Sequence, residues 1–148
     1  MNKSEIHEAC MQKLQTQLDE LKSAIDKVQE SVVGEENSTA GNKFETARAM
    51  GQEELDRLNR TLNNAIREMN IIRQIDVQKP CDSAQLGALI KTTRKTMYLS
   101  VGIGKIEIGK EKVFAISTSS PIGQELIGME EGEMVSFAGK REKIISIT

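Results

Sequence analysis

The sequence is poor in the residues that build aromatic cores and aromatic-lined pockets. Its 148 residues include no Trp, one Tyr and three Phe, so aromatic side chains make up only 3% of the chain. A large compact core built around an aromatic cluster is therefore not expected. The length suits one domain, or two small ones.

Long apolar runs, a strong net charge and a cysteine framework are also lacking. No run approaches the ~20 apolar residues of a membrane-spanning helix, and the N-terminus MNKSEIHEAC does not read as a signal peptide. A net charge of −2 argues against a basic, sequence-specific DNA binder. Cys10, Cys81 and the single histidine, His7, form neither a disulfide framework nor a zinc site. We expect a cytoplasmic protein with no membrane partner and no metal or cofactor of its own.

Two long stretches carry apolar residues at alternating spacings of three and four. The first covers residues 10–32 and the second residues 44–72, and no proline interrupts either one. This repeat is typical of a coiled-coil seam. It predicts two helices of roughly 30 residues, or ~45 Å each.

The two stretches match each other when the chain is folded back on itself. Facing positions then have residue numbers that add to 79 or 80, as for Val28 with Gly51 and Leu21 with Leu58. A parallel dimer would give no reason for this constant sum. The sequence predicts a monomeric antiparallel coiled-coil hairpin over residues 1–76.

The far end of this hairpin is small and polar. GEENSTAGNKFET follows the first apolar stretch and leads into the second. We place the tip at about residues 34–43 and centre the turn between Thr39 and Ala40. The tip acids are Glu35 and Glu36, and the turn is assigned to Asn37, Ser38, Thr39, Ala40 and Gly41.

After the hairpin the pattern changes. Residues 77–85 contain Pro80 and several turn formers, which indicates a linker. Residues 86–148 alternate apolar and polar positions and predict about five short antiparallel strands. One helix interrupts them, with Ser119 or Ser120 as N-cap and Pro121 at its first position. The fold class is α+β, a helical hairpin followed by a small sheet domain with one short helix.

Four stretches resemble the bacterial Gre factors (GreA and GreB). They are MQKLQTQLDELKS, FETARAMGQ, QIDV and, most specifically, ISTSSPIGQELIGMEEGEMVSF, and they follow one another in the family's order over essentially the whole chain. The family architecture is an antiparallel coiled coil followed by an FKBP-like α+β domain. That architecture agrees with the two halves predicted from periodicity.

The resemblance implies a transcription elongation factor rather than an enzyme. Gre factors dock their globular domain at the rim of the RNA polymerase secondary channel and insert the coiled coil. Two acidic tip residues then help the polymerase hold a second Mg²⁺, which stimulates cleavage of a backtracked transcript at its 3′ end. On this chain the resemblance assigns docking to Ser119, Ser120, Pro121, Ile122 and Gly123, and contact with the transcript to Arg48, Arg57 and Arg60. Acidic residues interleave with those arginines, so a mixed solvated face explains them as well.

The tip departs from the family pattern G-D-x-x-E-N-A-E-Y. Aligned at Gly34, the two acids are the adjacent Glu35 and Glu36 instead of residues three apart. Aligned at Phe44, the acid positions fall on Asn37 and Ala40. Two functions therefore stay open, a cleavage-stimulating factor and a secondary-channel regulator without cleavage activity.

Two further functions belong to other classes of protein. An FKBP-like domain could be a peptidyl-prolyl isomerase, but such pockets are apolar and aromatic-lined, and this half offers only Tyr98, Phe114 and Phe137. A chaperone-like coiled coil would need an apolar tip, and the tip here is polar.

Overall fold

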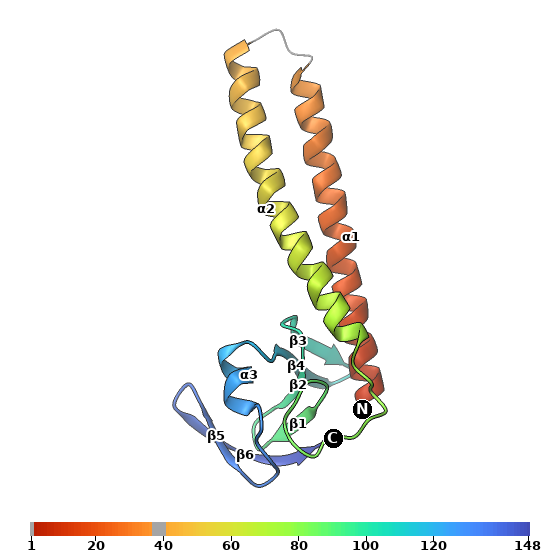
Figure 1. Cartoon of the computed structure of the whole chain (residues 1–148), viewed down its shortest axis with the longest axis vertical. Coiled ribbons are helices and arrows are strands. Elements are labelled where there is room, and N and C mark those ends of the chain that lie inside the picture. The colour runs from red at the N-terminus through yellow and green to blue at the C-terminus, as the bar shows by residue number, and fades with distance from the viewer. Residues whose placement is uncertain (1, 37–40) are drawn as a thin grey trace. The chain divides into compact units, whose positions relative to one another are not determined.

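The computed structural model describes the backbone of residues 2–36 and 41–148, and the side chains of these residues outside 32–44. The described residues form two long helices, six strands and one short helix, which confirms the predicted α+β class (Figure 1). They make two compact units. One unit combines Met1–Lys13 with Glu68–Thr148, and the other is Leu14–Arg67.

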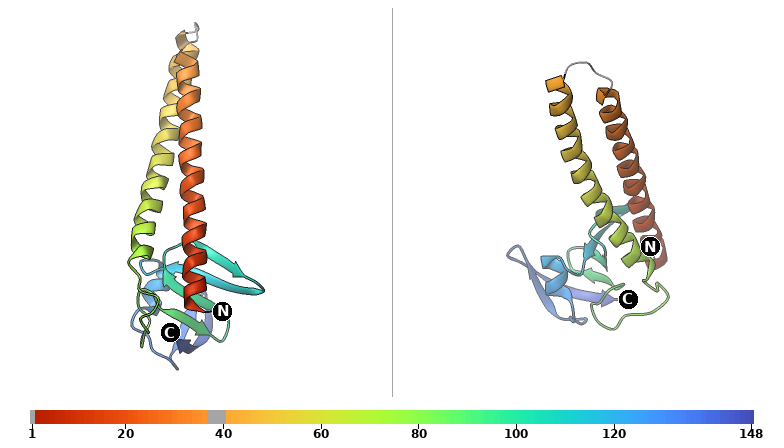
Figure 2. Two further views of the ribbon diagram at one scale, coloured as in Figure 1. Left: turned by 90° about the vertical axis from the view of Figure 1, so that its right-hand side faces the viewer. Right: turned by 45° about the horizontal axis from the view of Figure 1, so that its top comes forward.

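The unit Leu14–Arg67 consists of two antiparallel helices. Helix α1 covers Lys3–Glu36 and helix α2 covers Gly41–Arg73, and within this unit they run side by side in each view (Figure 2). Every described position of the predicted seam is buried or half-buried. Val28, Ala47 and Gly51 line one groove between the helices, as the constant sum predicts.

Helix α1 begins where a capping box fixes its first turn. The backbone N–H of Glu5 donates to Oδ1 of Asn2 at 2.8 Å, and the backbone N–H of Asn2 donates back to the Glu5 carboxylate at 3.3 Å. These two bonds satisfy donors that have no partner within the helix. Asn2 is therefore the N-cap, and the helix starts at Lys3.

The six strands form one sheet in the order β3-β4-β2-β1-β6-β5. Their bounds are Leu89–Thr92 for β1, Thr96–Ser100 for β2, Gly104–Ile108 for β3, Glu111–Ser117 for β4, Met134–Phe137 for β5 and Lys140–Ile147 for β6. The sequence predicts antiparallel strands throughout, and this is wrong for one pair, because β2 and β4 are parallel. Strand β3 follows β2 in sequence but does not pair with it, and it forms the edge of the sheet. Strand β4 then lies between β3 and β2, antiparallel to β3 and therefore parallel to β2.

One face of the sheet carries a hydrophobic core. Met97, Leu99 and Ile144 lie on it, and Leu126 of helix α3 (Pro121–Leu126) is fully buried in the same cluster. Residues 77–85, the predicted linker, contribute Cys81 and Ala84 to this core. The segment is therefore irregular in secondary structure but tightly packed.

Tyr98 of β2 points away from this cluster and meets His7 of α1. Its side chain is fully buried, and its hydroxyl lies 2.7 Å from Nδ1 of His7. Burial lowers the pKa of His7, and the nearby Lys3 ammonium lowers it further. The folded chain therefore favours uncharged His7, with its Nδ1 within hydrogen-bonding distance of the Tyr98 hydroxyl.

The burial of His7 against Tyr98 makes folding pH-dependent. Because the His7 pKa is lower in the folded chain, the unfolded chain binds more protons as the pH falls below about 6.5, and stability is lost through that range. The expected loss is only a few tenths of a kcal/mol, since the imidazole keeps contact with solvent. Urea unfolding at pH 7.5 and 5.5 should show a larger loss for the wild type than for His7→Gln. Equal losses would contradict this account of the His7–Tyr98 contact.

Within the described residues, no helix has an apolar stretch long enough to span a membrane.

Candidate functional site

The turn before helix α3 is rigidly capped. The hydroxyl of Ser120 donates to the backbone oxygen of Ser117 at 2.7 Å and accepts the backbone N–H of Gly123 at 3.0 Å. Pro121 occupies the first helical position, where a missing N–H costs nothing. Of the two candidates that the sequence predicts, Ser120 is the N-cap. Ser119 is exposed, and its hydroxyl is hydrogen-bonded to the hydroxyl of Ser117.

Removing this cap should loosen the turn measurably. Ser120→Ala deletes both hydrogen bonds, and N-cap losses of this kind cost about 1 kcal/mol. Ser119→Ala removes an exposed hydroxyl in the same segment and should change stability by less than about 0.5 kcal/mol. Urea denaturation compares the two variants. If both were equally stable, the cap would contribute nothing.

Two residues of this segment line an open groove of about 670 Å³. Pro121 and Ile122 line it together with the aromatic rings of Phe114 of β4 and Phe137 of β5. Gly123 does not line the groove. It is buried, and a Cβ added at this position would meet the backbone of Ser117 and Thr118. The groove is a largely apolar surface held between a capped helix and the sheet, a form suited to receiving apolar side chains of a partner.

An ion pair with one buried and one partly exposed member lines this groove. Glu142 of β6 is only 2% exposed, and its Oε2 lies 3.3 Å from Nζ of Lys95. The Lys95 ammonium also lies 4.8 Å from the centre of the Phe137 ring, within the range of cation–π attraction. Both charged residues line the groove.

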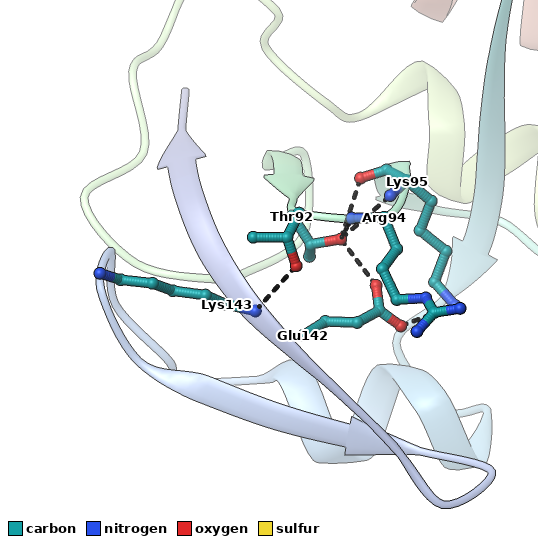
Figure 3. A network of polar contacts seen from close by, with 6 residues as sticks. Thr92, Arg94, Lys95, Glu142 and Lys143 are labelled. Atoms are coloured by element: carbon teal, nitrogen blue, oxygen red, sulfur yellow. Dashed lines mark hydrogen bonds and ion pairs between the residues drawn. The ribbon is translucent and has the colours of Figure 1, made fainter.

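The turn between β1 and β2 positions this pair (Figure 3). The hydroxyl of Thr92 donates to Oε1 of Glu142 at 2.7 Å and accepts the backbone N–H of Lys95 at 3.1 Å. The turn is also bonded to β6, where the backbone N–H of Thr93 donates to the oxygen of Lys143 at 3.0 Å. Both Glu142 oxygens thus have partners, as a buried carboxylate requires.

The two tip acids lie in a helix. Glu35 and Glu36 are the last two residues of α1, and Gly41 is the first residue of α2. The predicted turn residues Asn37, Ser38, Thr39 and Ala40 lie outside the described residues.

The three predicted transcript-contacting arginines are exposed but do not share a face of α2. Arg57 and Arg60 are one turn apart, whereas Arg48 is nine positions before Arg57, about half a turn around the helix. Arg57 is bonded to Glu54 through Nε at 2.9 Å, and this bond holds the pKa of Glu54 below its usual value. The helix therefore brings together Arg57 and Arg60, and not Arg48.

The sequence did not reveal Lys95 and Glu142 as part of this site. A signal was present, because Glu142 is in phase with Ile144 in the alternating strand KREKIISI and so falls on its inward face. The clear apolar alternation of KIISI begins at Lys143, so Glu142 lies just outside it. Lys95 is the last residue of the turn TTRK, and a lysine beside a predicted strand gives no sequence signal for a buried contact.

Among the described residues, no group of three or more His, Cys, Asp or Glu is placed to hold a metal ion. No family model matches the chain, and no curated protein matches it. Among solved structures, the chain is similar to that of the transcription factor Gfh1, with 14% identity over 93% of this chain and 92% of that chain and a TM-score of 0.37. A likeness this distant carries no argument about function.

Proposed function

We propose that this chain is an RNA polymerase-binding elongation factor and that it docks at the secondary-channel rim through the groove beside α3. One observation carries the proposal. The stretch with the most specific resemblance to the Gre factors, ISTSSPIGQELIGMEEGEMVSF, supplies Pro121 and Ile122 to an open apolar groove. A rigid turn that presents apolar side chains beside a groove suits a protein-docking role.

The helices supply the second part of the proposed function. Helix α1 has 34 residues, about 51 Å of helix, and its last two residues are Glu35 and Glu36. Inserted into the channel, these acids would help hold a second Mg²⁺ shared with the polymerase, since Mg²⁺ prefers carboxylate oxygen. A second metal stabilises the displacement that cuts a transcript. The chain itself would then stimulate the polymerase's own cleavage and catalyse nothing alone.

One observation favours the second candidate, a secondary-channel regulator without cleavage activity. Glu35 and Glu36 are consecutive positions of α1, and consecutive helix positions are about 100° apart around the axis. Acids three apart, as in the family pattern, would lie on one face. A regulator would occupy the channel without completing the metal site.

Transcript cleavage in a backtracked elongation complex of the cognate polymerase separates the two candidates. We expect wild type to shorten the transcript and Glu35→Ala/Glu36→Ala to lose this effect. Glu30→Ala, an exposed acid earlier in α1, is the matched control and should retain it. Binding without cleavage by the wild type would assign the regulator function. Absence of polymerase binding would remove both candidates.

A further inference from the structure

The ammonium of Lys95, which lines the docking groove, is held in place by two neighbouring groups. The Lys95 ammonium is bound by the Glu142 carboxylate at 3.3 Å and lies over the Phe137 ring at 4.8 Å. Its side chain is still 27% exposed, whereas Glu142 is 2% exposed. An ammonium carries three N–H donors, so one contact with Glu142 leaves it able to bind a further acceptor.

The accessible charge around the groove is mainly positive. Arg94 and Lys140 line it and are exposed, and Lys95 is partly exposed. Glu125 is the exposed acid of the lining, because Glu142 is buried and bonded to Thr92. A complementary partner would therefore carry a negative charge. Beside that charge, it would carry apolar side chains that contact the groove residues Ile122 and Phe137.

We propose that Lys95 is a specificity-determining residue of this groove and selects a protein segment that presents a carboxylate beside apolar side chains. The inference rests on the proposed function, in which that segment belongs to RNA polymerase. The pair with Glu142 holds Lys95 in one position, so a carboxylate at the matching place is bound without first ordering a flexible side chain. A partner with an amide there would leave the ammonium less well satisfied.

The test removes the charge without leaving a buried carboxylate behind. In Lys95→Met/Glu142→Leu the Met thioether can still pack on Phe137. The Thr92 hydroxyl, which loses Glu142 as an acceptor, can still donate a hydrogen bond to the backbone oxygen of residue 95 at 3.2 Å. Circular dichroism and urea unfolding verify that this variant is folded. Lys110→Met is the matched control, because Lys110 is exposed and does not line the groove.

Binding to core RNA polymerase is measured across a salt series. We expect the double variant to bind at least about tenfold more weakly than wild type at low salt, and its affinity to depend less on salt. Lys110→Met should bind like the wild type. If the double variant matched wild type in affinity and salt dependence, the role of Lys95 would be refuted while the proposed function stood. If the wild type failed to bind polymerase, the proposed function would fail and this inference with it.

Discussion

Gly123→Ala is expected to destabilise the sheet domain by about 3 kcal/mol, the upper end of the usual cost of overpacking. A Cβ at this position would lie 2.1 Å from the backbone oxygen of Ser117 and 3.0 Å from Cα of Thr118. Both contacts are with backbone, so no side-chain rotation can relieve them. The turn that carries Pro121 would have to move, and the groove wall would move with it.

Gly102→Ala is the matched control for this substitution. Its Cβ would meet the same residue, Ser117, but at an ordinary contact distance of 3.8 Å from Cβ. We expect a change within about 1 kcal/mol, of either sign. Urea denaturation of the two variants measures the difference. Equal stability would show that the close approach of Gly123 to Ser117 does not exist in solution.

Lys95→Ala is the second substitution with a large expected effect. It leaves the Glu142 carboxylate buried with only Thr92 as a side-chain partner. Removing one member of a fully buried pair costs about 3 to 5 kcal/mol. Because Lys95 is 27% exposed, water can reach the site, and we expect a smaller loss of about 2 to 3 kcal/mol.

The double variant Lys95→Met/Glu142→Leu separates two causes of instability: the unpaired Glu142 carboxylate and the loss of the Lys95 side chain from its packing. Replacing both charges by apolar groups is often neutral or stabilising, so the double variant should recover most of the loss seen in Lys95→Ala. Urea midpoints of wild type, single and double variants make the comparison. A double variant that is as unstable as the single one would mean that the ion pair is not the source of the effect.

The helical pair was largely predictable from the sequence. A seam repeat leaves a strong periodic signal, and antiparallel pairing adds a numerical constraint. The predicted seam positions Leu21, Val28 and Leu58 are accordingly buried or half-buried. Helix ends are set by local capping. The start of α1 at Lys3 depended on the reciprocal bonds of Asn2 and Glu5, which the helical repeat does not reveal.

The sheet was only partly predictable. Alternation identified the strands, because residues such as Val113 and Ala115 point inward at every second position. Strand order depends on contacts between distant segments, so alternation did not reveal that β4 would insert beside β2. The core role of Cys81 and Ala84 was hidden for a similar reason, since irregular segments bury residues without periodicity.

Some residues of the candidate site could be predicted from local sequence signals, and others could not. The sequence predicts Ser119 or Ser120 as N-cap and Pro121 at the first helical position, because helix N-termini have a local signature. The structure selects Ser120. Lys95 and Glu142 were missed because they are 47 positions apart and meet only through the pairing of β1 with β6. Long-range polar pairs of this kind need the folded sheet to become visible.

The measurement that most directly tests the central claim is the affinity of this chain for core RNA polymerase, compared with that of Ile122→Asp. Ile122 lines the groove, so a carboxylate there should weaken binding by ~30-fold or more, as for a central interface residue. Ile145→Asp, at an exposed isoleucine that does not line the groove, should bind like the wild type. Undiminished binding of Ile122→Asp, or no binding by the wild type, would contradict the account.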